Sequence, residues 1–482
     1  MNNIVRTRYA PSPTGSPHIG NTRSALFAWL FARHNNGVFI LRIEDTDVER
    51  KVEGSIEKIM EGLEWMGLDW DEGPRVGGKY GSYFQSERLD LYAKYSKQLV
   101  ESGHAYYCYC SEERLTAMRE EQIKRKLPPG YDRHCRNLTP EARQELEARG
   151  IKPVVRFKTP LSGKTSYHDE IWGDVSFDNT TIDDFILLKS DGFPTYHLAN
   201  VVDDHFMEVT HVLRAEEWIS SVPRHIMLYQ ALQWQPPVFA HLPMVLGPDR
   251  SKLSKRHGAT SILEFRDQGY LPEAVINFLA LVGWSLDDKT ELFTREELIK
   301  AFSIERVSKV AAIFNHEKLK WMNGVYMRKL TPDEFTRHSL PFLKQAWPEV
   351  ILSTDYVKKV LPLVQERTKL LTEVPSLTHY FFLDDLKYDA AGLVSKGMDA
   401  AGTRAALVTS LERLKNVEFT AASLEPMLRA LAEELKLKAG QLFGSLRTAV
   451  SGETATPPLF QMMEVLGKEK CLHRIQQAID LL

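Results

Sequence analysis

The feature that most constrains the fold of this chain is a proline- and glycine-rich stretch near its start, residues 8–21, which reads RYAPSPTGSPHIGN. It follows an apolar segment, residues 4–9, that predicts a strand, and it precedes an apolar segment, residues 24–33, with the spacing of a helix. Three prolines and two glycines exclude regular structure in between, so the stretch is expected to be a shaped loop that ends where a helix begins. Unpaired backbone N–H groups at a helix start bind phosphate, and His18 and Asn21 add side-chain donors there. The loop therefore predicts a nucleotide site.

The segments around this loop predict a parallel α/β sheet. A second apolar segment, residues 38–43, follows the helix candidate after an Asn36–Gly37 turn and is typical of a buried strand. Strand, helix and strand in this order form a parallel unit with a right-handed crossover, and ligands bind beyond the carboxyl ends of such strands. Because residues 8–12 and Glu44–Asp45 follow the two strands, we expect them to face one crevice.

The rest of the chain divides by its pattern. Residues 86–190 interrupt the α/β pattern and hold three of the four cysteines, and we interpret them as an inserted domain because strand candidates resume within residues 191–258. A basic loop, Lys252–Arg256 with the sequence KLSKR, lies near the end of that part. From residue 259 onward the spacing of apolar residues is almost wholly helical.

Composition limits the classes of function. The net charge of −3 over 482 residues excludes a polyanion binder that works by bulk charge, so a nucleic acid would have to meet local basic patches. No apolar run approaches the roughly 18 residues that span a bilayer, and the first residues lack the pattern of a secretory signal. Four cysteines in so long a chain do not make a disulfide scaffold. We therefore expect a cytoplasmic protein with no membrane partner.

Two short motifs bracket the predicted crevice. The first, His18-Ile19-Gly20-Asn21, and the second, the basic loop KLSKR, resemble the His-Ile-Gly-His and Lys-Met-Ser-Lys-Ser signatures of the class I aminoacyl-tRNA synthetases. Longer runs at residues 8–15, 42–47 and 191–204 are similar to the glutamyl/glutaminyl branch of that family. The run LRAEEW that begins at Leu213 and the helical C-terminal third are similar to the bacterial glutamyl enzymes, whereas a glutaminyl enzyme should end in β-barrels.

This resemblance implies a fold and a function. The expected fold is an α/β Rossmann-type catalytic core with an inserted α/β connective domain, followed by an all-α C-terminal region. The expected activity is that of a glutamate–tRNA ligase, which activates L-glutamate to glutamyl-adenylate with ATP and Mg²⁺ and transfers it to the 3′-terminal adenosine of tRNA(Glu). A monomer is expected. The predicted domains are two halves of the catalytic domain at 1–85 and 191–258, a connective domain for the tRNA acceptor end at 86–190, a helical stem-contact domain at 259–328, and an anticodon-binding region at 329–482, divided near 390.

The resemblance also implies the residues of the site. The glutamate pocket is expected to comprise Arg8, Ala10, Ser12, Glu44, Tyr196, Asn200 and Arg214. The ATP site is expected to comprise Pro11, Ser12, His18, Gly20, Asn21, Lys252, Ser254 and Lys255, of which His18, Lys252 and Lys255 act in catalysis. The attacking carboxylate is already an anion, so the reaction needs positioning and cations on the phosphates rather than a general base.

The two arginines of this pocket have an alternative interpretation. Arg8 and Arg214 follow strand candidates, and guanidinium groups bind a substrate carboxylate in a bidentate, charge-assisted way. They would otherwise pair within the protein with Glu44, Glu216 or Glu217, as most arginines are solvated or structurally paired. The basic loop likewise has a simpler interpretation as a solvated surface turn.

Three cysteines in the inserted segment suggest a zinc site. Cys108, Cys110 and Cys135 offer thiolates, which are good zinc ligands, but a structural site normally has four ligands. Zinc-binding relatives carry Cys-x-His here, whereas Asn137 stands in the place of that histidine, and His134 is the alternative fourth ligand. The other interpretation is three buried thiols without a metal.

Arg367 falls where the family places an arginine that reads an anticodon base, a task suited to a bidentate donor.

Two rival functions remain open from the sequence. One is a small-molecule adenylyltransferase with the same phosphate loop, which has no use for the helical C-terminal third. The other is a tRNA-binding protein without catalytic activity, against which the intact His18, Lys252 and Lys255 argue.

Overall fold

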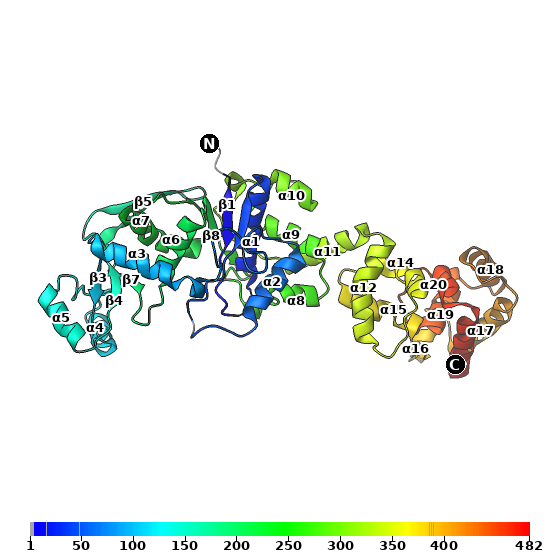
Figure 1. Cartoon of the computed structure of the whole chain (residues 1–482). Helices are drawn as coiled ribbons and strands as arrows, with labels where there is room; N and C mark the ends of the chain where they lie inside the picture. Colours follow the sequence, from blue (N-terminus) through cyan, green and yellow to red (C-terminus); the bar gives the residue numbers. More distant parts are fainter. Residues whose placement is uncertain (1–3, 16, 48, 385, 387, 389) are drawn as a thin grey trace. The chain divides into compact units, whose positions relative to one another are not determined.

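The computed structural model describes residues 4–15, 17–47, 49–384, 386, 388 and 390–482, without the side chain of Lys255 (Figure 1). The chain forms two compact units. The first comprises Met1–Asp267 and Pro272–His316, and the second comprises Gln268–Leu271 and Glu317–Leu482. Within the described ranges, no helix has both the length and the apolar character needed to cross a membrane.

The first unit begins with the predicted parallel unit. Strands β1 (Arg6–Tyr9) and β2 (Val38–Leu41) pair in parallel, and helix α1 (Ile19–His34) connects them and packs against both (Figure 1). The strand–loop–helix–strand prediction is thus confirmed. The helix begins at Ile19 rather than at Ser24, because His18 caps its N-terminus by accepting a hydrogen bond from the Gly20 N–H.

A four-stranded sheet with the order β6-β5-β9-β8 lies in the same unit. Its members are β5 (Lys164–Asp169), β6 (Gly173–Asp178), β8 (His211–Ala215) and β9 (Val238–Leu242). Strand β8 pairs in parallel with β9, and its start lies beside β1, where the Thr210 N–H donates to the Arg6 carbonyl at 2.9 Å. The β5–β6 hairpin was not predicted. It comes from the segment interpreted as inserted, yet β5 joins β9 at Asp169.

The remainder of the inserted segment contains a three-stranded antiparallel sheet, β3-β4-β7, with helices around it (Figure 1). The strands are β3 (Ala105–Cys108), β4 (Val154–Phe157) and β7 (Ile186–Leu188). The helices of this region and of the sequence that follows it are α3 (Leu89–Glu101), α4 (Glu112–Lys124), α5 (Pro140–Ala148), α6 (Tyr196–Phe206) and α7 (Val222–Ala231). The core beneath the sheet includes Tyr92 and Leu99 of α3.

Short elements complete the first unit. Helix α2 (Ser55–Met66) ends at Gly67, whose left-handed backbone (φ 63°) is typical of a helix C-terminus. The others are α8 (Ile262–Asp267), α9 (Pro272–Leu281), α10 (Arg295–Ala301) and the two-residue strands β10 (Val245–Leu246) and β11 (Ala312–Ile313), which pair in parallel.

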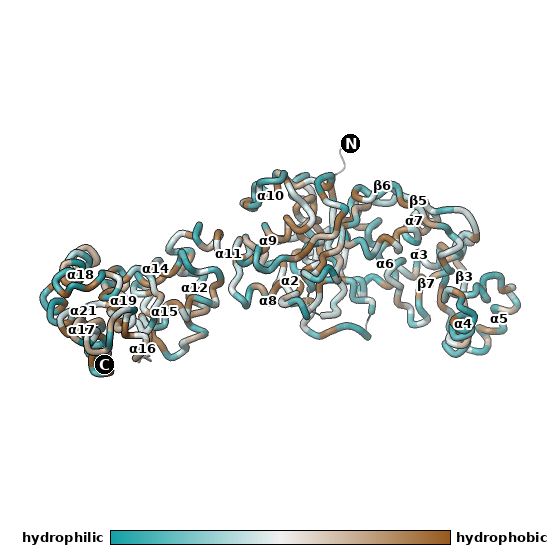
Figure 2. The backbone as a smooth tube through the Cα atoms, turned by 180° about the vertical axis from the view of Figure 1, so that it is seen from behind, coloured by the Kyte–Doolittle hydropathy of each residue, from teal (hydrophilic) through white to brown (hydrophobic). Residues whose placement is uncertain are grey.

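The second unit is helical throughout its described part, as predicted. Hydrophobic and hydrophilic residues alternate along its helices, as expected when each helix buries one face (Figure 2). A capping box at Thr331 opens α12, and Thr420 caps α18. The helices are α11 (His316–Lys329, which starts in the first unit), α12 (Pro332–Ala346), α13 (Thr354–Val360), α14 (Pro362–Gln365), α15 (Val374–Phe382), α16 (Ala390–Leu393), α17 (Ala400–Leu414), α18 (Ala421–Glu434), α19 (Ala439–Ser451), α20 (Leu459–Leu466) and α21 (Lys468–Leu481).

Candidate active site

A cavity of about 1160 Å³ opens at the carboxyl ends of β1, β2 and β8. Both residues 8–12 and Glu44 contribute to its wall, so the predicted crevice is present. The residues predicted for the glutamate pocket all line it, namely Arg8, Ala10, Ser12, Glu44, Tyr196, Asn200 and Arg214. Pro11 and Asn21 of the predicted ATP set line it as well. The fold therefore collects side chains as far apart in the sequence as Arg8 and Arg214 into one chamber.

One wall of the chamber is a buried ionic network. Arg8 donates from Nε to Oδ1 of Asp204 at 3.2 Å, and Arg42 donates from Nη1 to the same oxygen at 2.7 Å. Oε1 of Glu44 accepts from Arg42 Nη2 at 3.1 Å and from Asn200 Nδ2 at 3.3 Å. Burial raises the pKa of Glu44 in spite of the two arginines, whereas the arginines outweigh burial at Asp204 and lower its pKa. Arg8 is thus paired inside the protein with an acid, although not with one of the three predicted as alternatives.

Arg214, in contrast to Arg8, has no carboxylate among its described partners. Its Nε donates to Nε2 of His241 at 3.0 Å, its Nη1 to the Tyr196 hydroxyl at 2.6 Å, and its Nη2 to the Trp218 carbonyl at 3.4 Å. Its side chain is nonetheless buried, with a 7% exposed fraction. The cavity therefore has one guanidinium whose charge no adjacent acid balances.

The two acids proposed as alternative partners of Arg214 are engaged elsewhere. Glu216 accepts from the Met244 N–H at 3.1 Å, and Glu217 pairs with Lys252 at 2.7 Å. Burial also raises the pKa of the Tyr196 hydroxyl, so this group stays protonated beside Arg214 at neutral pH.

His18 lies where the loop meets α1. The N–H of Ile19 donates to the Thr260 carbonyl at 2.7 Å, which fixes the helix start against the segment that follows the basic loop. Burial lowers the pKa of His18, and the nearby Lys252 charge lowers it further, so the imidazole is neutral at pH 7. A Cβ at Gly20 would meet only the His18 ring at 3.6 Å. Packing does not require glycine there, and the missing side chain leaves space for a ligand.

The basic loop is held by ionic contacts of its own. Lys252 pairs with Glu217, and the Ser254 N–H donates to Nδ1 of His257 at 3.1 Å. The backbone of Lys255 begins a short 3₁₀ turn, and its side chain lies outside the described part. Among the residues that the structure describes, four of the predicted ATP set do not line the 1160 Å³ cavity: His18, Gly20, Lys252 and Ser254.

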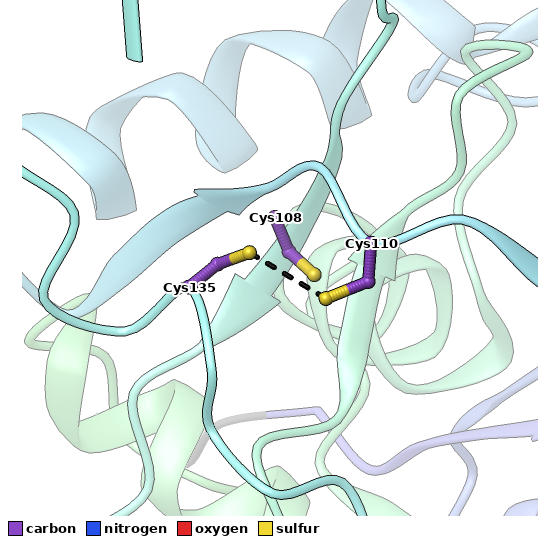
Figure 3. A group of neighbouring side chains, drawn as sticks. All are labelled: Cys108, Cys110 and Cys135. Carbon is purple, nitrogen blue, oxygen red and sulfur yellow. Dashed lines mark hydrogen bonds between the residues drawn. The ribbon is translucent and has the colours of Figure 1, made fainter. Parts of the chain in front are cut away.

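The three cysteines of the inserted segment meet at the end of β3 (Figure 3). Their Sγ atoms lie within 4.8 Å of one another, and Cys110 and Cys135 are hydrogen-bonded at 3.5 Å. The Tyr131 hydroxyl contacts Sγ of Cys108 at 3.2 Å and Sγ of Cys110 at 3.5 Å. His134 is exposed and contributes no ring atom to this group. Asn137 is exposed as well, and the Tyr131 hydroxyl rather than a histidine contacts the thiols. Nη1 of Arg114 also contacts Sγ of Cys110, at 3.6 Å.

In the second unit, Arg367 follows α14 and is exposed. Its charge acts on the buried Tyr380 hydroxyl and on Arg447, which donates to Oγ1 of Thr456 at 2.7 Å. Within the described residues the Tyr380 hydroxyl has no hydrogen-bond partner. Arg367 itself is therefore exposed, with a buried hydroxyl and a second guanidinium close enough to feel its charge.

The sequence reasoning missed the groups that hold the arginines in place. Asp204 lies in the run 191–204 that was singled out, but it was given no role, and Asp169 and His241 were not considered. The signal for Asp204 was available, since a buried arginine at a strand end requires an acceptor. His241 had no such signal, because its position opposite Arg214 depends on the register of β8 with β9.

The chamber at the carboxyl ends of the parallel strands, with His18 at the helix start, agrees with the family resemblance of the two short motifs. Residues 4–321 match the family described as tRNA synthetases class I (E and Q), catalytic domain, and residues 334–479 match an anticodon binding domain. The chain belongs to this class I family for glutamate and glutamine.

The relatives that it resembles over its full length are glutamate–tRNA ligases. It is 57% identical to a glutamate–tRNA ligase of Dehalococcoides mccartyi (strain CBDB1) over 483 residues, which cover 99% of this chain and 98% of that protein. It is 50% identical to the glutamate–tRNA ligase of Moorella thermoacetica over 481 residues, with 99% and 98% covered. A crystal structure of a glutamate tRNA ligase from Elizabethkingia meningosepticum, in complex with its amino acid, matches with a TM-score of 0.91 at 37% identity and covers 99% of both chains.

Proposed function

We propose that the chain activates L-glutamate with ATP and transfers the glutamyl group to the 3′-terminal adenosine of tRNA(Glu), with the residues assigned below. It is a glutamate–tRNA ligase, in accordance with relatives that match it over nearly its whole length. The observation that carries the residue assignment is the buried Arg214, whose charge no adjacent carboxylate balances, in the same chamber as Arg8 and Glu44.

In this proposal the chamber selects glutamate by charge. Arg214 and Arg8 bind the side-chain carboxylate. Arg214 supplies the selectivity, because a buried guanidinium without an acidic partner favours an anion over a neutral amide. Glu44 binds the substrate ammonium, and Tyr196 and Asn200 line the space between them. Ala10 and Ser12 border the chamber from the loop side.

The chemistry then requires alignment. The substrate α-carboxylate attacks the α-phosphorus of ATP, the new O–P bond forms and pyrophosphate leaves with the electron pair of the broken P–O bond. A hydroxyl of the terminal adenosine then attacks the glutamyl carbonyl and gives up its proton to the departing phosphate, and AMP leaves with the electron pair of the broken acyl C–O bond. His18, the helix N-terminus at Gly20 and Asn21, Ser254, Lys252 and Lys255 hold the phosphates. Lys252 would exchange the Glu217 carboxylate for a phosphate when ATP binds.

Mg²⁺ belongs to the nucleotide in this scheme. The residues assigned to ATP supply cations, hydroxyls, an amide and backbone N–H groups, and none of them is a carboxylate. Such a set fits a metal that arrives with the phosphates and keeps water ligands, as Mg²⁺ commonly does. The ion supplies charge neutralisation on the phosphates.

The tRNA would be bound along the chain in the order of the predicted domains. Residues 86–190 bind the acceptor end, residues 259–328 contact the stem, and residues 329–482 bind the anticodon, with Arg367 reading one base. The match of residues 334–479 to an anticodon binding domain supports the last of these assignments. It also argues against the small-molecule adenylyltransferase. The cytoplasmic location and the monomeric state remain predictions.

Zinc is proposed for the cysteine cluster. Three sulfur atoms within 4.8 Å of one another fit a thiophilic ion, and the Tyr131 hydroxyl, which contacts Cys108 and Cys110, offers an oxygen beside them. Cys108, Cys110, Cys135 and Tyr131 would hold the ion, which would tie the end of β3 to residues 131–135. Its role there is structural, since the fold puts the cluster outside the chamber lined by Arg214.

The test of the proposed function is aminoacylation. Purified protein, ATP, Mg²⁺ and a tRNA(Glu) transcript are incubated with radiolabelled glutamate or glutamine, and acid-precipitable label is counted. The proposal predicts labelled tRNA with glutamate that is lost on mild alkaline treatment, as an ester should be. Label that enters only with glutamine, or no label with either amino acid, would contradict the proposal.

A further inference from the structure

Arg214 is held by a chain of hydrogen bonds that crosses three neighbouring strands. Arg214 on β8 and His241 on β9 are direct partners in the parallel register, so their side chains project from the same face. Nε of Arg214 donates to Nε2 of His241 at 3.0 Å, and Nδ1 of His241 lies 2.5 Å from Oδ2 of Asp169, the last residue of β5. His241 and Asp169 are fully buried. The chain therefore runs from the core of the sheet to the wall of the chamber.

The partners of His241 determine its tautomer. Arginine has donors only, so Nε2 of His241 must carry a lone pair toward Arg214. The proton therefore resides on Nδ1 and is donated to Asp169. Burial lowers the pKa of His241 to about 4, which keeps the ring neutral at pH 7. A protonated ring would carry a proton on Nε2 as well, and this N–H would repel the Arg214 N–H.

Asp169 is fixed as firmly as the imidazole. Its Oδ1 accepts the backbone N–H groups of Ile171, Trp172 and His241 at 3.0, 3.0 and 3.3 Å, so Oδ2 is the oxygen left for the ring. Burial alone would raise the pKa of Asp169, but the hydrogen bond from His241 lowers it below its usual value. The carboxylate is therefore ionised and oriented toward Nδ1.

Both arginines of the chamber donate a hydrogen bond from Nε to a buried acceptor, but the acceptor of Arg8 is charged and that of Arg214 is neutral. Each of the two arginines lines the chamber. The anchor of Arg8 is the carboxylate of Asp204, which balances its charge directly. The anchor of Arg214 is a neutral ring, and the acid behind it is one imidazole further away. Arg214 is thereby oriented without being neutralised.

We propose that His241 and Asp169 are positioning residues for amino-acid selection: they orient Arg214 toward the substrate side-chain carboxylate while leaving its positive charge available. The inference deepens the proposed function and rests on it. The preference for glutamate over glutamine then depends on the tautomer of His241 as well as on Arg214. Neither residue takes part in the chemical step, so their loss should raise the KM for the amino acid and not the KM for ATP.

The decisive variant is Asp169→Asn, which keeps the shape of the side chain. The backbone N–H groups at Oδ1 require the amide oxygen on that side, so the amide NH₂ faces Nδ1 of His241 and moves the ring proton to Nε2. That proton would oppose the Arg214 N–H. We expect the KM for glutamate to rise about tenfold or more, as for a lost hydrogen bond to a charged group. A purely electrostatic role for Asp169 predicts the reverse, because removal of a negative charge should favour the anionic substrate.

Three further variants complete the test. His241→Leu removes the acceptor and should raise the KM for glutamate by a similar factor, whereas His241→Gln offers an amide oxygen to Arg214 and should restore most of the affinity. Tyr167→Phe is the matched control, since the Tyr167 ring packs against His241 and its hydroxyl has no partner among the described residues. It should leave every constant unchanged.

The readouts are ATP–pyrophosphate exchange with tRNA present, measured against glutamate, glutamine and ATP, and thermal unfolding of each variant. The inference predicts a raised KM for glutamate, an unchanged KM for ATP and a smaller preference for glutamate over glutamine in Asp169→Asn and His241→Leu. An unchanged or lowered KM for glutamate in a folded Asp169→Asn variant would overturn it. Failure of the proposed function is a separate result, because then the unmodified protein itself would show no glutamate-dependent exchange.

Discussion

Substitution of Arg214 by alanine should weaken glutamate binding with little loss of unfolding free energy. The side chain is buried in the chamber wall, and its Nη2 is held only by a long contact of 3.4 Å to the Trp218 carbonyl. A substrate carboxylate would gain charge-assisted hydrogen bonds from this end of the guanidinium, each worth about 1.5–3 kcal/mol. Loss of about 3 kcal/mol corresponds to a rise of about 150-fold in the KM for glutamate. The internal partners of Arg214 are neutral, so its removal leaves no unbalanced buried charge.

Arg8→Ala is the matched comparison for this prediction. Arg8 is paired with the buried Asp204, which would keep only Arg42 as a cationic partner. We expect this variant to lose both glutamate affinity and about 1–3 kcal/mol of unfolding free energy, as for a buried group left short of a partner. The assay is pyrophosphate exchange at increasing glutamate, combined with urea unfolding of both variants. An Arg214→Ala protein that keeps the normal KM for glutamate, or one as destabilised as Arg8→Ala, would refute the reasoning.

Three more predictions follow from other parts of the molecule. Lys255→Ala should lower the rate of adenylate formation far more than it changes the affinity for glutamate; an unchanged rate in single-turnover exchange would remove Lys255 from phosphate binding. The purified protein should contain about one zinc ion per chain by metal analysis, and Tyr131→Phe should release zinc to a chelator faster; a metal-free protein that unfolds normally would contradict the zinc proposal. Acid should destabilise the first unit, because burial lowers the pKa of His241 to about 4 and that of His225 well below its usual value. Below pH 6.5 the unfolded chain binds protons that the folded one does not, so each histidine should reduce the unfolding free energy by about 1.4 kcal/mol per pH unit. Urea unfolding at pH 7, 6 and 5 should show a smaller slope for His225→Gln, and an equal slope would argue against this origin.

The parts of the site that were predictable are those fixed by local sequence. The loop 8–21 places Arg8 and His18 at a strand end and a helix start, and its prolines and glycines exclude other structures for most of its length. Glu44 follows the next parallel strand, so it reaches the same edge whatever the rest of the chain does. For these residues the period of the apolar pattern and the position of the turns were sufficient.

The parts that were not predictable depend on contacts between distant segments. Strand β5 has alternating buried and exposed residues, a pattern that was overlooked, but its pairing with β9 could not be deduced from either segment alone. The chain from Asp169 to Arg214 exists only because of that pairing. Tyr131 is a comparable case, since a tyrosine four positions before Cys135 gives no sign that its hydroxyl meets Cys108.

The charge of this chamber should decide which amino acid the protein activates. ATP–pyrophosphate exchange by the unmodified protein is followed with glutamate and with glutamine, each with and without tRNA(Glu). The account predicts exchange with glutamate that greatly exceeds exchange with glutamine when tRNA is present. Exchange that favours glutamine, or its absence under all four conditions, would contradict it.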